Sequence, residues 1–131
     1  MNILAIDSSA AQEGSVSRIL VDHALALLLQ AHPGATVVRR DVGAAPTPHL
    51  TPLNLAGVRG VPSTPCEMTA RALSDELIGE ARAAHTILIG APMYNFSLPT
   101  GLRGWFDYVL RAGETFRYSE AGPRDCWAAS A

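Results

Sequence analysis

The chain has 131 residues, of which 48% are hydrophobic and 17% charged, and its net charge is −2. This length and composition predict one globular domain, and they exclude both a disordered chain and a strongly basic protein that binds nucleic acid. All 10 basic residues are arginine, so any reaction that uses a lysine amine is also excluded.

The N-terminus begins directly with an apolar run, without the basic flank of a signal peptide, and no apolar run is long enough to span a membrane. We therefore expect a cytoplasmic protein with no membrane partner. Cys66 and Cys126 lack the spacing of a metal or redox motif and are expected to be reduced. No metal site is expected either, because the histidines are scattered without ligand spacing: His23, His32, His49 and His85.

Residues 2–7 form an apolar run that predicts a buried strand, and a polar loop follows at 8–15. A helix is expected to begin near Ser15 or Ser17 and to end at the His32-Pro33-Gly34 segment. Its expected inward stripe comprises Val16, Ile19, Leu20, His23, Ala24, Leu27, Leu28 and Ala31. Residues 36–41 predict a second strand near a sheet edge, and the strand-helix-strand order implies parallel pairing.

Residues 42–63 contain too many glycines and prolines for a long regular element, which favours a surface excursion that acts as a lid or binding segment. Thr64-Pro65-Cys66-Glu67 has the pattern of a capping box and predicts the start of a second helix. The expected inward stripe of this helix is Ala70, Leu73, Leu77, Ala81 and Ala84.

A third strand is expected at Thr86 to Ala91, followed by a third helix with Gly113 as its C-cap. One side of this helix is expected to present Leu98, Leu102, Trp105, Phe106 and Val109. The pattern as a whole predicts an α/β protein with an incomplete doubly wound parallel sheet of about three strands and three helices.

The loop after the first strand has the composition of a phosphate cradle. Its hydroxyls and amides lie at the start of a helix, where unpaired N–H groups and partial positive charge stabilise a phosphate. It is neither a Walker loop nor a dinucleotide GxGxxG motif. Serines here also commonly cap a helix and form a turn, and the loop alone leaves both interpretations open.

The loop after the third strand is typical of a segment that holds a flat ring. Pro92 and Pro99 bracket a short segment that cannot be helical throughout, so its shape is fixed and irregular. Core or surface packing would also explain its apolar residues, but exposed amides beside aromatic side chains favour a flavin ring. Because both loops end parallel strands at the same edge of the sheet, together they predict FMN.

From Met1 to about Pro123 the sequence resembles the FMN-dependent NADH-azoreductases, a flavodoxin-like bacterial family that also reduces quinones. The resemblance rests on the serine loop and on three further blocks, at residues 73–78, 91–96 and 111–118. The last two blocks are specific to this family.

The resemblance implies particular contacts. Ser9 and the run Ser15, Val16 and Ser17 would contact the FMN phosphate, and the run Met93, Tyr94, Asn95 and Phe96 would contact the ring. Asn95 and the neighbouring amides are expected at the polar edge of the ring, and Phe116 near the face on which substrates stack.

The resemblance also implies a homodimer that depends on FMN. In a ping-pong reaction NADH or NADPH would reduce FMN, and a quinone or an aromatic azo compound would then accept the electrons. No side chain is expected to act as a nucleophile. Arg59 could meet the extra phosphate of NADPH, but a solvated arginine explains it better, so the choice of donor stays open.

Family members continue after Glu-x-Gly-Pro into a fourth strand and a Ser-Arg-Gly-Gly loop that also contacts FMN. Here the last segment, Arg124 to Ala131, has no strand pattern. We therefore expect a partial FMN-binding domain at 1–123, a tail outside the family pattern at 124–131, and a C-terminally shortened gene product. An exposed edge on the third strand and weaker FMN binding would follow.

Two other functions remain open on the sequence. One is a flavodoxin-like electron-transfer protein without a substrate reaction of its own, and the other is an inactive remnant that binds nothing. Steady consumption of NADH with a quinone would exclude the first, and a yellow protein that releases FMN on denaturation would exclude the second.

Overall fold

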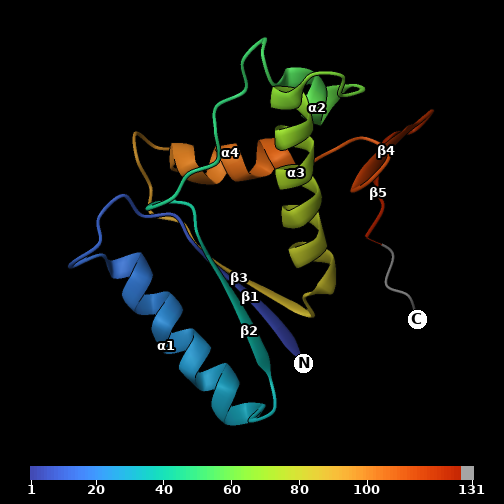
Figure 1. Cartoon of the computed structure of the whole chain (residues 1–131). Coiled ribbons are helices and arrows are strands. Elements are labelled where there is room, and N and C mark those ends of the chain that lie inside the picture. The colour runs from blue at the N-terminus through green and yellow to red at the C-terminus, as the bar shows by residue number, and fades with distance from the viewer. Residues whose placement is uncertain (128–131) are drawn as a thin grey trace. The chain divides into compact units, whose positions relative to one another are not determined.

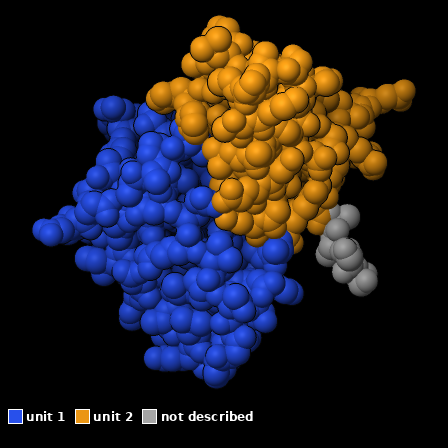
Figure 2. All heavy atoms as spheres, viewed as in Figure 1, with its two compact units in different colours: residues 1–47, 83–105 blue, residues 48–82, 106–131 orange. Residues whose placement is uncertain are grey.

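The structure is a computed structural model that describes residues 1–127. The chain divides into two compact units, shown in different colours in Figure 2. Unit 1 comprises Met1–Thr47 and Ala83–Trp105, and unit 2 comprises Pro48–Arg82 and the chain from Phe106 onward. Within residues 1–127, no helix combines the length and the apolar character needed to cross a membrane.

Unit 1 contains a parallel three-stranded sheet (Figure 1). Its strands are β1 (Asn2–Asp7), β2 (Thr36–Asp41) and β3 (Thr86–Gly90), in the order β2-β1-β3. Because β1 is central, Ile3 and Ile6 are at most 1% exposed. The predicted strands, their parallel pairing and the edge position of β2 are confirmed.

Helix α1 (Val16–Ala31) begins and ends where predicted, but the predicted inward stripe is wrong. Val16, Ile19, Leu20 and Leu27 are between 53% and 68% exposed, whereas Val21, outside that stripe, is buried. Helix α1 approaches β3 so closely that a Cβ on Gly90 would lie 2.7 Å from Val21 Cγ2. The helix is apolar on more than one side, so periodicity alone could not identify the inward face.

Unit 2 contains α2 (Leu55–Arg59) within the long excursion and most of α3 (Pro65–Ala83). The predicted capping box is confirmed. Glu67 N donates to Thr64 Oγ1 at 3.2 Å, and Thr64 N donates to Glu67 Oε2 at 3.0 Å. Ser63 N also donates to Glu67 Oε2 at 2.8 Å, and this bond, followed by the one from Thr64 N, holds the pKa of Glu67 below its ordinary value. Ala70, Leu77 and Ala81 are buried as predicted, and Leu73 and Ala84 are half-buried.

Helix α4 (Thr100–Val109) crosses the boundary between the units. Leu102, Trp105 and Val109 are buried as predicted, whereas Leu98 precedes the helix and is 42% exposed. The prediction that Gly113 caps this helix is wrong because the helix ends at Val109. Gly113 instead has φ +82° in a following turn, where its amide donates to Phe116 O at 2.7 Å.

An antiparallel hairpin in unit 2 was not predicted. It pairs β4 (Phe116–Ser119) with β5 (Gly122–Asp125), so the expectation that the last segment has no strand is wrong. The sequence of β5 contains Gly, Pro and Asp, which are rare in strands, so composition hid it. Pairing to β4 overrides that preference, and the Ser119 hydroxyl also donates to Gly122 O at 2.7 Å. The end of the expected tail, residues 128–131, lies outside the described residues.

Candidate functional site

The two predicted loops leave neighbouring strands of unit 1 at the same end of the sheet. Asp7 is in register with Gly90, the last residues of β1 and β3. The next residue, Ser8, is buried, and its hydroxyl donates to Gly90 O at 2.6 Å. The start of the serine loop is therefore fixed to the end of β3.

Tyr94 connects the loop after β3 to the serine loop. Its hydroxyl accepts a hydrogen bond from Ala10 N at 3.2 Å and lies 3.4 Å from Ser9 Oγ. The structure thus brings together a residue predicted to contact the phosphate and one predicted to contact the ring. It also shows that Tyr94 has a role in holding the two loops, which the sequence did not suggest.

Ser15 occupies the N-cap position of α1 without capping the helix. Its side chain makes no capping hydrogen bond, and its hydroxyl lies 3.2 Å from Ser17 Oγ instead. Helix N-termini carry amides without intrahelical partners, and a side chain at the N-cap usually satisfies one of them. This geometry counts against capping by Ser15, and the phosphate interpretation of the serine loop stays a prediction. Val16, between the two serines, is exposed.

The loop after β3 has an unusual backbone. Asn95 and Phe96 both have positive φ, 49° and 63°. Tyr94 N donates to Ser97 O and Ser97 N donates to Tyr94 O, both at 3.0 Å, and together they close the turn. Asparagine tolerates this region, but a bulky residue such as phenylalanine rarely adopts it, and such strain concentrates at functional sites.

The side chains of this turn are exposed. Phe96 is 95% exposed and Met93 is 72% exposed. The loop encloses a hollow of about 290 Å³ lined by Ala91, Pro92, Met93, Phe96, Ser97 and Leu98. This exposure excludes the core half of the alternative interpretation for Phe96 and Met93, and it leaves surface residues or a ring-binding segment.

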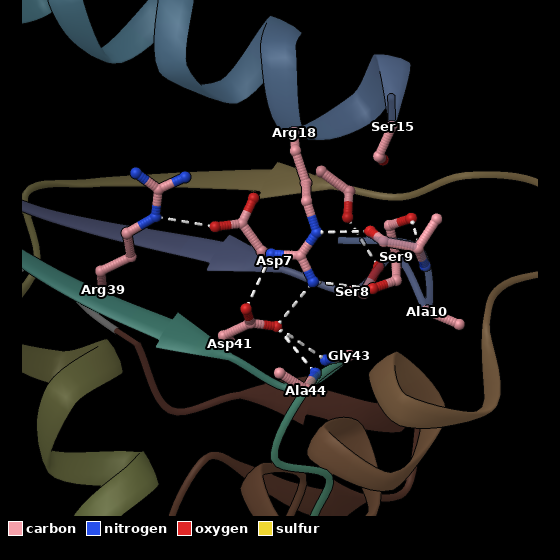
Figure 3. Close-up of polar contacts among 12 residues, drawn as sticks. Asp7, Ser8, Ser9, Ala10, Ser15, Arg18, Arg39, Asp41, Gly43 and Ala44 are labelled. Atoms are coloured by element: carbon pink, nitrogen blue, oxygen red, sulfur yellow. Dashed lines mark hydrogen bonds and ion pairs between the residues drawn. The ribbon is translucent and has the colours of Figure 1, made fainter. Parts of the chain in front are cut away.

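Sequence reasoning missed an arginine that holds the serine loop (Figure 3). Arg18 Nη2 donates to Ser9 O at 2.7 Å, and Nε donates to Ala11 O at 2.9 Å. Its Nη1 and Nη2 also donate to Asp41 Oδ2 and Oδ1, at 2.7 and 2.9 Å. The available signal was a carboxylate at the end of β2 and an arginine in the first turn of α1.

A second ion-pair network lies at the same end of the sheet. Asp7 is 1% exposed, and its Oδ2 accepts a hydrogen bond from Arg39 Nε at 2.8 Å. Arg39 Nη2 also contacts Asp22 Oδ1 on α1 at 2.6 Å. These bonds raise the pKa of Arg39, with the bond to Asp7 as the largest cause. Asp7 directly precedes the serine loop, and the charges of Asp7 and Arg39 also act on Arg18.

The Arg18–Asp41 pair predicts acid sensitivity. The hydrogen bond from Arg18, followed by those from Ala44 N and Gly43 N, holds the pKa of Asp41 below its ordinary value. A carboxylate with a lowered folded-state pKa stabilises the fold above its unfolded pKa of about 4, and this contribution is lost as pH falls through the folded pKa. We expect denaturant midpoints to fall in that acidic window and the Asp41→Asn variant to lose that part of the dependence. An unchanged pH profile in this variant would contradict the assignment.

Phe116, predicted near the substrate, belongs to unit 2. It is half-buried and packs edge-on against Tyr118, with ring centroids 5.4 Å apart. Both rings line a cavity of about 470 Å³ that also includes Arg59, Arg71 and Arg111. The role of Phe116 stays a prediction.

Arg59, the residue considered for contact with the extra phosphate of NADPH, donates from Nη1 to Leu110 O at 3.1 Å. The choice between NADH and NADPH stays open.

The sequence matches the profile of a family described as having a flavodoxin-like fold over residues 1–127. The chain belongs to this flavodoxin-like family. The match extends past residue 123, where the domain was expected to end. It agrees with the parallel sheet of unit 1 and with the placement of two loops at the carboxyl ends of its strands.

Several known proteins are similar to the chain. An FMN-dependent NADH:quinone oxidoreductase of Hyphomonas neptunium is 67% identical over 93% of this chain and 59% of its own length. One from Azotobacter vinelandii is 46% identical over 93% of this chain and 62% of its own length. The crystal structure of an azoreductase from Bacillus anthracis str. Sterne superposes with a TM-score of 0.83 at 29% identity, covering 95% of this chain and 62% of its own length.

The chain therefore spans only about three fifths of the length of these relatives, 59% and 62% for the two oxidoreductases. Both loops of unit 1 lie within residues 1–127, which match the family profile. Among residues 1–127, no cluster of potential metal ligands is present.

Proposed function

We propose that the chain binds FMN through the two loops of unit 1 and serves the reduction of quinones and aromatic azo compounds by NADH or NADPH. The observation that carries the proposal is the N-cap serine that does not cap. The hydroxyls of Ser15 and Ser17 contact each other and make no capping bond to α1. They lie at the start of this helix, where a phosphate would be stabilised. The names of the relatives support the choice of FMN and of a quinone.

The residues fit a flavin mononucleotide in both chemistry and order. The hydroxyls of Ser9, Ser15 and Ser17 and the amide of Val16 would hold the phosphate. The exposed turn would hold the ring, with Met93 and Phe96 giving apolar contact. Tyr94 belongs to the loop after β3 and contacts the serine loop, so it would hold the phosphate end and the ring end of the site at a fixed distance from each other.

Asn95 lies at the tip of the turn with φ 49°, and its side-chain amide would donate to or accept from the polar edge of the ring. Bound FMN would supply the redox chemistry, accepting a hydride from the nicotinamide donor and passing electrons to the acceptor in a ping-pong order. No side chain serves as a nucleophile in this proposal. Phe116 would stack against the acceptor.

The homodimer and the cytoplasmic location are also part of the proposal. Leu53, Val61 and Met68 in unit 2 are 73%, 87% and 56% exposed, and exposed apolar residues of this size favour a protein partner such as a second copy. The free cysteines Cys66 and Cys126 fit a reducing compartment. We further propose that residues 1–123 form the FMN-binding domain and that 124–131 lie outside it.

An electron-transfer protein is the second candidate. The exposure of Phe96, at 95%, favours it because an open ring edge suits electron exchange with a protein partner. The candidates separate in one assay. With FMN bound, steady oxidation of NADH by a soluble quinone supports the reductase, whereas FMN binding without turnover supports the carrier.

The cofactor assignment predicts a preference for FMN over riboflavin, which has the same ring without the phosphate. We expect the purified protein to bind FMN more tightly than riboflavin in a fluorescence titration. Ser17→Ala should weaken FMN binding about tenfold, because it removes one hydroxyl bond to a charged group. Riboflavin binding should be unchanged.

Ser63→Ala is the matched control, because among residues 1–127 the bonds of this serine in unit 2 are to Glu67, and it should affect neither flavin. Equal affinity for both flavins would show that the serine loop does not hold the phosphate. A protein that binds neither flavin would refute the proposed function and leave the inactive remnant.

A further inference from the structure

Arg18 fixes the main chain of the serine loop. Its side chain extends from the first turn of α1 and is 13% exposed. Figure 3 shows its guanidinium between the loop and the end of β2, and it donates to Ser9 O at 2.7 Å and to Ala11 O at 2.9 Å. One planar group therefore holds two carbonyls of a loop that has no regular structure.

Asp41 holds the guanidinium in turn. The carboxylate accepts two parallel bonds from Arg18, at 2.7 and 2.9 Å, which is the most specific arginine–carboxylate geometry. Its Oδ1 also accepts the amides of Gly43 at 3.1 Å and Ala44 at 2.9 Å. The carboxylate is thus fixed by its own main chain, and the pair transmits the position of β2 to the serine loop.

The hydroxyl of Ser9 depends on this arrangement. Ser9 Oγ accepts the amide of Ala11 at 3.2 Å, and the carbonyls of the same two residues are the ones that Arg18 binds. The paired Asp41 neutralises the guanidinium, so Arg18 brings little net charge to the loop. Its contribution is geometric.

We propose that Arg18 is a positioning residue for the phosphate end of the cofactor, acting through the main chain of Ser9 and Ala11 rather than by attracting the phosphate. The inference rests on the proposed function, because the ligand is the FMN assigned there. It adds the Arg18–Asp41 pair to the site, and it explains why a helix start without lysine suffices to hold a phosphate.

Two variants separate positioning from charge attraction. Arg18→Lys keeps the positive charge but loses the planar fork, so positioning predicts FMN binding weakened about tenfold. Asp41→Asn leaves the guanidinium without its counter-charge. If Arg18 attracts the phosphate by charge, this variant should bind FMN more tightly. If Arg18 positions the loop, the variant should bind FMN more weakly, because the guanidinium loses the carboxylate that fixes it.

The experiment titrates each variant with FMN and with riboflavin at low and high salt. We expect both variants to lose FMN affinity, to keep riboflavin affinity within about twofold of the parent, and to keep the salt dependence of the parent. Arg82→Lys is the matched control because it makes the same exchange at an arginine of unit 2, whose ion pair is with Glu114 and includes no residue of either loop. It should keep the parental ratio of FMN to riboflavin affinity.

Retained riboflavin binding shows that a variant is folded, so loss of structure cannot imitate the expected result. Tighter FMN binding by Asp41→Asn, or a parental affinity ratio in Arg18→Lys, would overturn the inference and leave the proposed function intact. A parent protein that binds no flavin would refute the proposed function itself. The two failures are therefore distinguishable.

Discussion

Replacing Gly43 with alanine is expected to destabilise the protein by about 3 kcal/mol, because the added methyl group has no space and overpacking of this kind forces the main chain to move. A Cβ at Gly43 would lie 2.1 Å from Ser9 O and 2.8 Å from Ser9 C. Both atoms are main chain, so no side-chain rotation relieves the clash. The same Cβ would lie 3.0 Å from Arg18 Nη2, and the displaced loop would therefore lose its clamp as well.

Gly34→Ala is the control for this substitution. It lies in the turn between α1 and β2, where an added Cβ would meet nothing within 4 Å, and it should change the free energy of unfolding little. Denaturant unfolding measures both variants. Because Ser9 moves in Gly43→Ala, FMN affinity should fall further than riboflavin affinity. A Gly43→Ala protein as stable as Gly34→Ala would show that the loop lies farther from Gly43 than the structure places it.

Local signals in the sequence were sufficient for most elements of the fold. The capping box at Thr64 predicted the start of α3, because two reciprocal hydrogen bonds over three residues need no tertiary partner. The strands β1 and β3 could also be predicted from the sequence, since short apolar runs between polar loops are typical of a parallel sheet. Their order placed both candidate loops at one end of the sheet.

The errors concern features that depend on packing rather than on local pattern. The inward face of α1 is set by close approach at Gly90, which periodicity does not report. The hairpin β4–β5 forms in a segment of poor strand composition, because pairing and its turn decide it. Gly113, predicted as the helix C-cap, has positive φ but serves a following turn and not the helix end.

The site shows the same division. The serines and the irregular segment that contains Asn95 were predicted as site residues from residue types placed after strands. The Arg18–Asp41 pair joins residues 23 positions apart, and the contact of Tyr94 with Ser9 spans 85 positions, so neither has a local signature. The carboxylates that end β1 and β2 indicate that polar side chains meet at this end of the sheet. The sequence does not show which residue each of them contacts.

The apolar surfaces of unit 1 agree with the expected exposure of the third strand. In the described residues β3 pairs with β1 alone, and Ile87 and Ile89 are 41% and 39% exposed. Together with the exposed face of α1 at Ile19 and Leu20, they leave apolar area in water. We therefore expect the chain to aggregate in solution, which light scattering measures.

Removing Arg39 is expected to cost about 3 kcal/mol at neutral pH, because Asp7 would remain as a buried carboxylate without its counter-charge. Asp7 is 1% exposed, and its Oδ1 has no hydrogen-bond partner among the described residues, so Arg39 supplies the bond to Oδ2 without a substitute. The expected loss of stability is at the low end of the range for broken buried ion pairs, because the Arg39 side chain is itself 42% exposed and water can enter the space that it leaves.

A double-mutant cycle tests this cause. Asp7→Asn removes the buried charge, so Arg39→Ala should cost much less in that background than in the parent. Arg82→Ala provides the comparison with a solvated pair, because the Arg82 and Glu114 side chains are 46% and 40% exposed, and it should cost about 1 kcal/mol or less. Additive losses in the cycle would mean that the stability of β1 does not depend on the charge of Asp7. The central strand would then owe its position to apolar packing alone, and the ion pairs at its end would serve only to shape the loops beside it.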